Sequence, residues 1–234
     1  MDLAGCPLPE DRLYDLEHDV WYREDPDGGS GRVGLLAPLV WFAGPFQAVT
    51  FRPAADGPVG RGRSVATVES TRYTGAVRLP FDATVLERNA AIVERPRLLN
   101  DAPYGDGWVA RVRPVDGGAL PSTLEAAAAV ADRLSDRIRT QRIRCWPQVP
   151  DLDLYEIGIE CSAVLTMLNE ELGRRAAGTA VLLVTDDPTS PIEMERWSDQ
   201  TGHRLLAHRR EGNLHQVLVR KEAHPVPRRR PSGA

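Results

Sequence analysis

Short apolar stretches fill the first half of the chain, and turn-forming residues separate them. Across 12–114 the turns are marked by D-P-D-G-G-S-G at 25–31, A-A-D-G-P at 54–58 and D-A-P-Y-G-D-G at 101–107. Many short strands with glycine- and proline-rich turns are typical of a β-sandwich or barrel. One apolar run, 35–42, is too short for its period to separate a helix from a buried strand. The pattern predicts an all-β first domain.

Helical spacing begins after Pro121, where Ser122 can cap a helix. Apolar side chains recur on one face of this segment: Leu124, Ala127, Ala128, Ala131, Leu134 and Ile138. The opposite face carries Arg133, Arg137, Arg139 and Arg142. We expect that face to be solvated, with docking of an acidic partner as the alternative. The glycines at 117 and 118 break the preceding pattern, so we assign 115–150 to a connecting helix and linker.

The period changes again after Pro150. In chain order, the pattern predicts a strand at 154–159, a helix through 164–172, a strand at 181–184, a helix from 191 to about 202, and strands at 204–209 and 214–220. This β-α-β-α-β-β order predicts a two-layer α/β sandwich over 151–221. Residues 222–234 have little apolar content, and we expect them to form a disordered tail. The chain is therefore expected to be multidomain.

Composition narrows the possible classes of protein. The formal net charge is −4, and neither predicted domain is basic, which argues against a nucleic-acid partner. No apolar run approaches the ~20 residues of a membrane span, and the N-terminus lacks a signal-peptide pattern, so we expect no membrane partner and a cytoplasmic protein. Cys6, Cys145 and Cys161 cannot all pair, and we expect their thiols to be reduced.

The basic residues are 28 arginines and a single lysine, Lys221. Schiff bases, P-loops and lysine-attached cofactors are therefore excluded from 1–220. The five histidines are scattered, although the strands at 204–209 and 214–220 could bring His208 near His215. We predict no metal and no cofactor.

Four segments of the first domain resemble the H protein of the glycine-cleavage system. They are E-H-D-V-W (17–21), V-E-S-T-R-Y-T-G-A-V-R-L-P (68–80), V-L-E-R-N (85–89) and L-L-N-D-A-P-Y-G-D-G-W-V-A-R-V-R-P (98–114). The resemblance covers 12–114 and implies a lipoyl-carrying β-barrel.

The H-protein resemblance also implies a lipoyl-lysine on a hairpin that follows the V-E-S segment. Counting without a gap places Arg72 at that position. A guanidinium stays charged and is a poor nucleophile, so it cannot form the lipoyl amide. The domain is therefore expected to be non-lipoylatable. Glu69, Ser70 and Tyr73 flank Arg72 in a hairpin that either contacts a partner or is an ordinary exposed turn.

The second domain resembles the TusA/SirA family of sulfur carriers. The matching segments are L-Y-E-I-G-I-E-C (154–161), V-L-L-V-T-D-D-P (181–188), T-G-H-R-L-L (201–206) and V-L-V-R-K (217–221). The resemblance implies that Cys161 accepts a sulfane sulfur as a persulfide. A thiol at a helix N-terminus faces free N–H groups and the positive end of the dipole, which stabilise the thiolate.

The residues around Cys161 depart from the Cys-Pro-x-Pro motif of that family. Ser162 and Val164 replace both prolines, and Glu160 opposes thiolate formation. An inert, packed cysteine is the alternative to persulfide chemistry. Cys6 begins a literal Cys-Pro-Leu-Pro, but no strand precedes it, and we expect a solvated N-terminal segment there. Cys145 is expected to pack beside Trp146.

Together the two resemblances favour a sulfur carrier or sulfurtransferase-like relay protein. Cys161 would be the acceptor, and the H-like domain would be a docking module. The expected partners are proteins: a sulfur donor such as a desulfurase, an acceptor enzyme, and a lipoate-handling enzyme. One alternative is a non-catalytic scaffold or regulator of a lipoate- or sulfur-handling enzyme. A second alternative is an H-type carrier in glycine cleavage, which the missing lysine disfavours.

Overall fold

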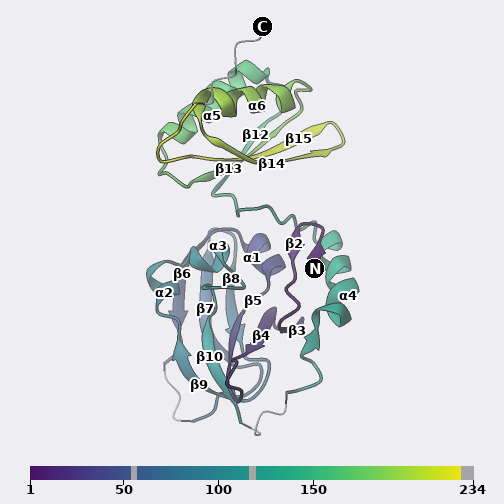
Figure 1. Cartoon of the computed structure of the whole chain (residues 1–234), viewed down its shortest axis with the longest axis vertical. Helices are drawn as coiled ribbons and strands as arrows, with labels where there is room; N and C mark the ends of the chain where they lie inside the picture. The colour runs from purple at the N-terminus through teal and green to yellow at the C-terminus, as the bar shows by residue number, and fades with distance from the viewer. Residues whose placement is uncertain (54–56, 116–119, 228–234) are drawn as a thin grey trace. The chain divides into compact units, whose positions relative to one another are not determined.

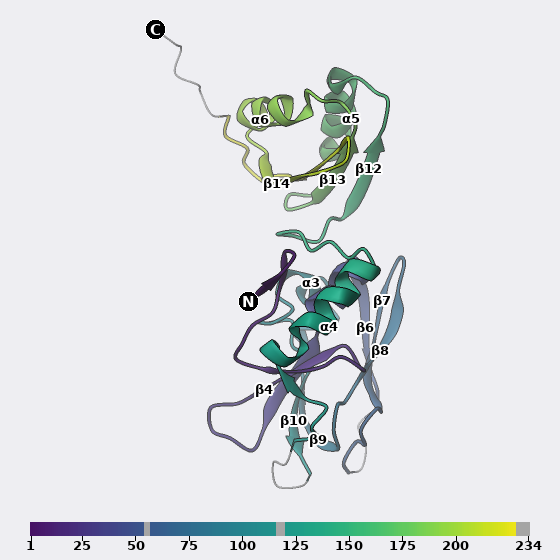
Figure 2. The same ribbon diagram turned by 90° about the vertical axis from the view of Figure 1, so that its right-hand side faces the viewer.

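The computed structural model describes residues 1–53, 57–115 and 120–227. It divides into two units, Met1–Cys145 and Trp146–Ala234 (Figures 1 and 2). The predicted break at 117–118 and the end of the predicted tail, 228–234, lie outside the described residues. Within the described ranges, every helix is too short or too polar to cross a bilayer.

The N-terminal unit is built on antiparallel sheets. The largest has six strands in the order β11 (Glu125–Ala126), β3 (Leu13–Asp15), β4 (Val20–Glu24), β5 (Gly31–Leu35), β10 (Ala110–Pro114) and β9 (Ala83–Arg88). A three-stranded sheet contains β6 (Phe46–Phe51), β7 (Ser64–Ser70) and β8 (Thr74–Arg78). A two-stranded sheet pairs β1 (Asp2–Leu3) with β2 (Cys6–Pro7). The prediction of a β-rich first domain is confirmed.

Three short helices interrupt these strands. They are α1 (Ala37–Ala43), α2 (Ala91–Glu94) and α3 (Leu98–Asp101). The ambiguous apolar run therefore contains both alternatives, since β5 ends at Leu35 and α1 follows after one residue. Pro38 lies in the first turn of α1, where a missing N–H costs nothing, and Gly44 ends the helix with a positive φ of 74°.

A longer helix, α4 (Ala127–Thr140), begins five residues after the predicted cap at Ser122. The reason is tertiary: Glu125 and Ala126 pair with Tyr14 and Leu13 of β3 before the helix starts. The apolar face of α4 joins the core of the N-terminal unit (Figure 2), with these buried residues: Cys6, Leu8, Tyr14, Trp21, Leu36, Ala127, Val130, Leu134 and Ile138. The helix expected as a connector thus completes the first unit.

The arginine face of α4 is only partly solvated. Arg137 forms an ion pair with Asp19 and donates to the Leu16 carbonyl at 3.2 Å, which joins the helix to the β3–β4 turn. Arg133 pairs with Glu125 at 2.5 Å. Burial raises the pKa of Asp19, although Arg137 opposes that rise. The expectation of a wholly solvated face is therefore wrong for Arg137.

A disulfide joins Cys6 to Cys145, across 139 residues of sequence. Their Cα atoms lie 4.9 Å apart, and both residues are buried in the same core as α4. The prediction of reduced thiols is therefore wrong for Cys6 and Cys145, although Cys161 is free, and the prediction of a solvated segment at Cys6 is wrong. The number of cysteines does not indicate which two of them lie close together in the fold. Here α4 brings the chain back to the β1–β2 hairpin, and Cys145, which follows α4, therefore lies beside Cys6.

The C-terminal unit contains a four-stranded sheet in the order β12 (Leu152–Glu156), β13 (Ala180–Thr185), β15 (Leu214–Arg220) and β14 (Arg204–Glu211). Only the β12–β13 pair is parallel. The helices α5 (Cys161–Gly173) and α6 (Ser190–Thr201) lie on the same side of the sheet (Figure 1). They enclose a core of Val164, Leu168, Leu172, Val181, Leu183, Met194, Trp197, Val217 and Val219.

The helix α6 ends at Gly202, where the sequence pattern placed its end. Gly202 has a φ of 74°, and a Cβ built on it would lie 2.4 Å from the Val226 backbone nitrogen. The described start of the predicted tail therefore packs against this glycine and is not a free chain, which corrects the expectation for that part of 222–234.

We predict that the purified, unreduced protein exposes one titratable thiol, that of Cys161, when it is denatured. After reduction it should expose three. Removing a native disulfide typically costs about 2–4 kcal/mol, so a reductant should also lower the melting temperature of the N-terminal unit. Thiol titration and calorimetry measure both effects. A Cys6→Ala/Cys145→Ala variant should not respond to reductant, and three thiols before reduction would contradict the disulfide.

Candidate functional site

The hairpin tip, residues 70–74 between β7 and β8, presents Arg72 as an exposed residue. The Ser70 N–H donates to the Tyr73 carbonyl at 2.8 Å and closes the turn. The Ser70 hydroxyl donates to the Ala43 carbonyl at 2.7 Å, which fastens the tip to the end of α1. Tyr73 also meets Phe42 edge to face, with ring centroids 6.4 Å apart. The tip therefore has a fixed position on the unit.

Gly44 lets the Arg72 side chain lie close to the backbone behind the tip. A Cβ built on Gly44 would be 2.7 Å from both Nε and Nη2 of Arg72. The buried Asn100 holds this segment, because its amide donates to the Gly44 carbonyl and its oxygen accepts from the Phe46 N–H, both at 2.9 Å. Phe42 remains half exposed, at 50%. Phe42, Arg72 and Tyr73 thus form one supported surface, which we call the tip surface.

The single lysine lies far from this hairpin in sequence, in the C-terminal unit. The ammonium of Lys221 donates to the carbonyls of Leu172, Arg175 and Gly173 at 2.6, 2.7 and 3.5 Å. A lysine can cap the free carbonyls at the end of a helix in this way, and it does so for α5. Lys221 therefore has a structural role, and its amine is engaged.

Cys161 is the first residue of α5, as the sequence resemblance implies, and it is buried. Its backbone N–H is already occupied, because it donates to Oδ2 of Asp187 at 2.8 Å. Burial raises the pKa of the Cys161 thiol, and the negative charges of Asp187 and Glu193 raise it further. The thiol pKa is therefore raised in the structure, whereas the position at the helix start predicted that it would be lowered.

The histidines of the last two strands do come together. His208 Nε2 and His215 Nδ1 are 3.0 Å apart, and the rings stack with centroids 5.2 Å apart. Burial and the neighbouring His208 lower the pKa of His215. His215 is only 6% exposed, so it is not a surface position.

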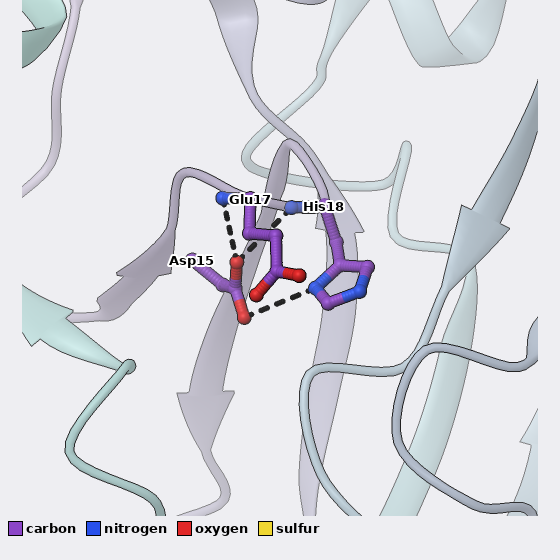
Figure 3. Close-up of side chains that lie close together, drawn as sticks. All are labelled: Asp15, Glu17 and His18. Carbon is purple, nitrogen blue, oxygen red and sulfur yellow. Dashed lines mark hydrogen bonds and ion pairs between the residues drawn. The ribbon is translucent and has the colours of Figure 1, made fainter.

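A cluster that the sequence reading overlooked lies in the β3–β4 turn, where Asp15, Glu17 and His18 gather (Figure 3). The buried Asp15 carboxylate accepts from the backbone N–H groups of Glu17 and His18 at 2.8 and 3.0 Å, and contacts His18 Nδ1 at 3.2 Å. Glu17 pairs with Arg61 at 2.7 Å. The carboxylates of Asp15 and Glu17 are therefore both occupied by contacts within the protein. We interpret the cluster as one that stabilises the turn. The D-x-E-H spacing was the available sequence signal.

The predicted site residues belong to different units, with Arg72 in the first and Cys161 in the second. The first unit combines antiparallel sheets with an exposed, braced hairpin between β7 and β8. Its class is therefore that of a lipoyl-type β-domain, and the placement of Arg72 at the attachment position stays a prediction.

Comparison with known proteins identifies the family. The model of the glycine cleavage H-protein family matches residues 12–137, more than half of the chain. This chain belongs to that family. The match runs beyond the expected end at residue 114 and takes in most of α4, which agrees with the packing of that helix in the first unit.

Curated relatives give the same picture. Glycine cleavage system H protein 5 of Aquifex aeolicus is 36% identical over 149 residues, covering 62% of this chain and 98% of the relative. H protein 2 of the same organism is 30% identical over 144 residues, covering 62% and 88%. Among solved structures, an H protein from Mycobacterium marinum matches at 29% identity and a TM-score of 0.47, covering 54% of this chain and 98% of that one. The TusA/SirA resemblance of 151–221 stays a prediction.

The acidic setting of Cys161 predicts slow alkylation. At pH 7.5 iodoacetamide should modify the native thiol more slowly than a cysteine in a model peptide, because less thiolate is present and the side chain is buried. Asp187→Asn keeps a hydrogen-bond acceptor for the Cys161 N–H but removes the charge, so the thiol pKa should fall and the rate should rise severalfold. Mass spectrometry follows the reaction.

The matched control for this experiment is Asp186→Asn. Asp186 accepts from the Gly158 N–H at 2.7 Å and is not among the groups that shift the thiol pKa. Cys161 in the Asp186→Asn variant should be alkylated at the same rate as in the unmutated protein. Alkylation of the unmutated Cys161 faster than the peptide would overturn this description of the thiol.

Proposed function

We propose that this chain is an H-type docking protein that carries no lipoyl group. It would use the tip surface to engage an enzyme that handles lipoyl groups, and so act as a scaffold or regulator of that enzyme. The observation that carries the proposal is Arg72 at the hairpin tip of an H-protein family fold. The only lysine, Lys221, caps α5.

The contacts around the tip support a binding role. Three separate interactions hold it: the Ser70–Ala43 hydrogen bond, the Tyr73–Phe42 ring contact and the close approach of Arg72 to Gly44. A supported surface that already holds its bound shape loses little conformational entropy on association. Phe42 and Arg72 also belong to residue types, aromatic and arginine, that are enriched at protein interfaces.

A sulfur relay through Cys161 is the second candidate. It is favoured by one observation: Cys161 is the free cysteine among the described residues, and it begins a helix of 13 residues. The raised thiol pKa and the occupied N–H count against it. The alkylation experiment bears directly on it, because a persulfide acceptor needs a reactive thiolate.

The docking proposal predicts competition. The purified chain should inhibit lipoylation of a lysine-bearing H protein by a lipoate ligase, and the inhibition should be competitive with that H protein. Phe42→Ala should raise the inhibition constant at least about fivefold, because truncating a central aromatic of an interface typically costs about 1 kcal/mol or more. Gel or mass assays of the H protein measure the rate.

Ile192→Ala is the matched control, since Ile192 is a similarly exposed apolar residue, at 59%, in the C-terminal unit. It should inhibit as well as the unmutated chain does. Absence of inhibition at high micromolar concentrations, or equal inhibition by Phe42→Ala, would refute docking through the tip surface.

A further inference from the structure

A second feature of the N-terminal unit, separate from the tip surface, is an open cavity of about 840 Å³. It is formed where residues 52–53 and 57–60, the start of β7, the end of β8 and the strand β9 meet. Pockets of about 300–1,000 Å³ are the size that small organic ligands fill. None of its lining residues belongs to the hairpin tip or to α1.

Four arginines line this cavity: Arg52, Arg63, Arg78 and Arg88. Among its described lining residues, Glu87 is the one that carries a carboxylate. The concentration of positive charge stands out in a chain with a net charge of −4. We call this cavity the arginine pocket.

The strand pairing brings the arginines together from distant positions. The Arg52 N–H donates to the Val65 carbonyl at 2.9 Å, and Ser64 pairs with Arg78, so three neighbouring strand ends each contribute a guanidinium. Arg78 Nη1 donates to the Gly62 carbonyl at 2.8 Å. Arg88 reaches across from β9, and its guanidinium carbon lies 5.8 Å from the Phe51 ring centroid.

The side chains of Arg52 and Arg63 are exposed and form no hydrogen bond or ion pair in the described part of the chain. Their guanidinium donors are therefore available to a ligand. Like charges that line one pocket repel, and a bound anion would relieve that repulsion. A guanidinium presents a planar fork that matches phosphate and carboxylate oxygens.

The remaining wall of the arginine pocket is largely apolar, with Val59, Val65, Val85 and Leu86 among its members. Such a wall suits the carbon skeleton of an organic ligand better than a bare inorganic ion. We propose that the arginine pocket binds a small organic molecule carrying two or more phosphate or carboxylate groups. Arg52 and Arg63 would bind its anionic groups, and Arg78 and Arg88 would add positive charge to the wall of the pocket.

Titration calorimetry on the full chain at low ionic strength tests this site, with two probes that separate the anion classes: pyrophosphate for phosphate groups and citrate for carboxylates. We expect saturable one-to-one binding of at least one probe, and weakening as salt is added. The probe that binds more tightly identifies the class. Arg52→Gln/Arg63→Gln should weaken that binding at least about tenfold, because each lost charge-assisted contact is worth roughly a factor of ten.

Arg139→Gln is the control for the loss of positive charge. Arg139 lies in α4 of the same unit, outside the pocket, and its side chain is 80% exposed. This variant should bind the probe as the unmutated chain does, and unchanged melting temperatures should show that all variants fold. Two results would overturn the proposal: no saturable binding of either probe, or equal weakening by Arg139→Gln and the double variant.

Discussion

The permanent charge of a guanidinium decides what the hairpin between β7 and β8 can do. Forming an amide requires an amine that can lose its proton, and an arginine side chain keeps its charge at every physiological pH. Because Arg72 lies at the tip and the single lysine, Lys221, donates to three carbonyl groups at the end of α5, we expect this H-protein family member to carry no lipoyl group. Under the proposed function, the hairpin acts by binding a partner.

That role depends on a rigid platform, and the N-terminal unit provides one. Asn100 fixes the backbone on both sides of the turn that follows α1, so the end of α1 and the hairpin tip are positioned together. On another side of the unit, α4 fills the core, and the disulfide from Cys6 to Cys145 ties the two ends of the unit covalently. The same scaffold also assembles the arginine pocket from four strand ends.

Local pattern predicted much of the fold. A continuous apolar run predicted the strand β13, and the E-G-N turn predicted that β14 and β15 form a hairpin. A glycine predicted the end of α6 near Gly202. These signals each lie within a few residues of one another. The start of α4 was predicted four residues too early, because pairing of Glu125 and Ala126 with β3 overrides a capping signal. Propensity is a weak prior where such tertiary contacts compete.

The sites were harder to predict because their parts are distant in sequence. Counting residues from the V-E-S segment predicted that Arg72 lies at the hairpin tip. It did not predict that the Arg72 side chain packs against the backbone at Gly44. The helix start at Cys161 was also predicted. The thiol pKa, however, is raised first by burial and then by Asp187 and Glu193, which come from the following strand–helix connection and helix. The disulfide and the arginine pocket depend on contacts between segments that no local spacing reveals.

The central claim is that residue 72 occupies the attachment position and that arginine there prevents lipoylation. The most direct test of this claim is the substitution Arg72→Lys. Treated with lipoate and a ligase that lipoylates a genuine H protein, the unmutated chain should keep its intact mass, whereas Arg72→Lys should gain one lipoyl group. Adding Lys221→Arg to that variant should leave the gain unchanged, which assigns it to residue 72. A lipoyl-sized increase on the unmutated chain, or a folded Arg72→Lys protein that the ligase leaves unmodified, would contradict the account.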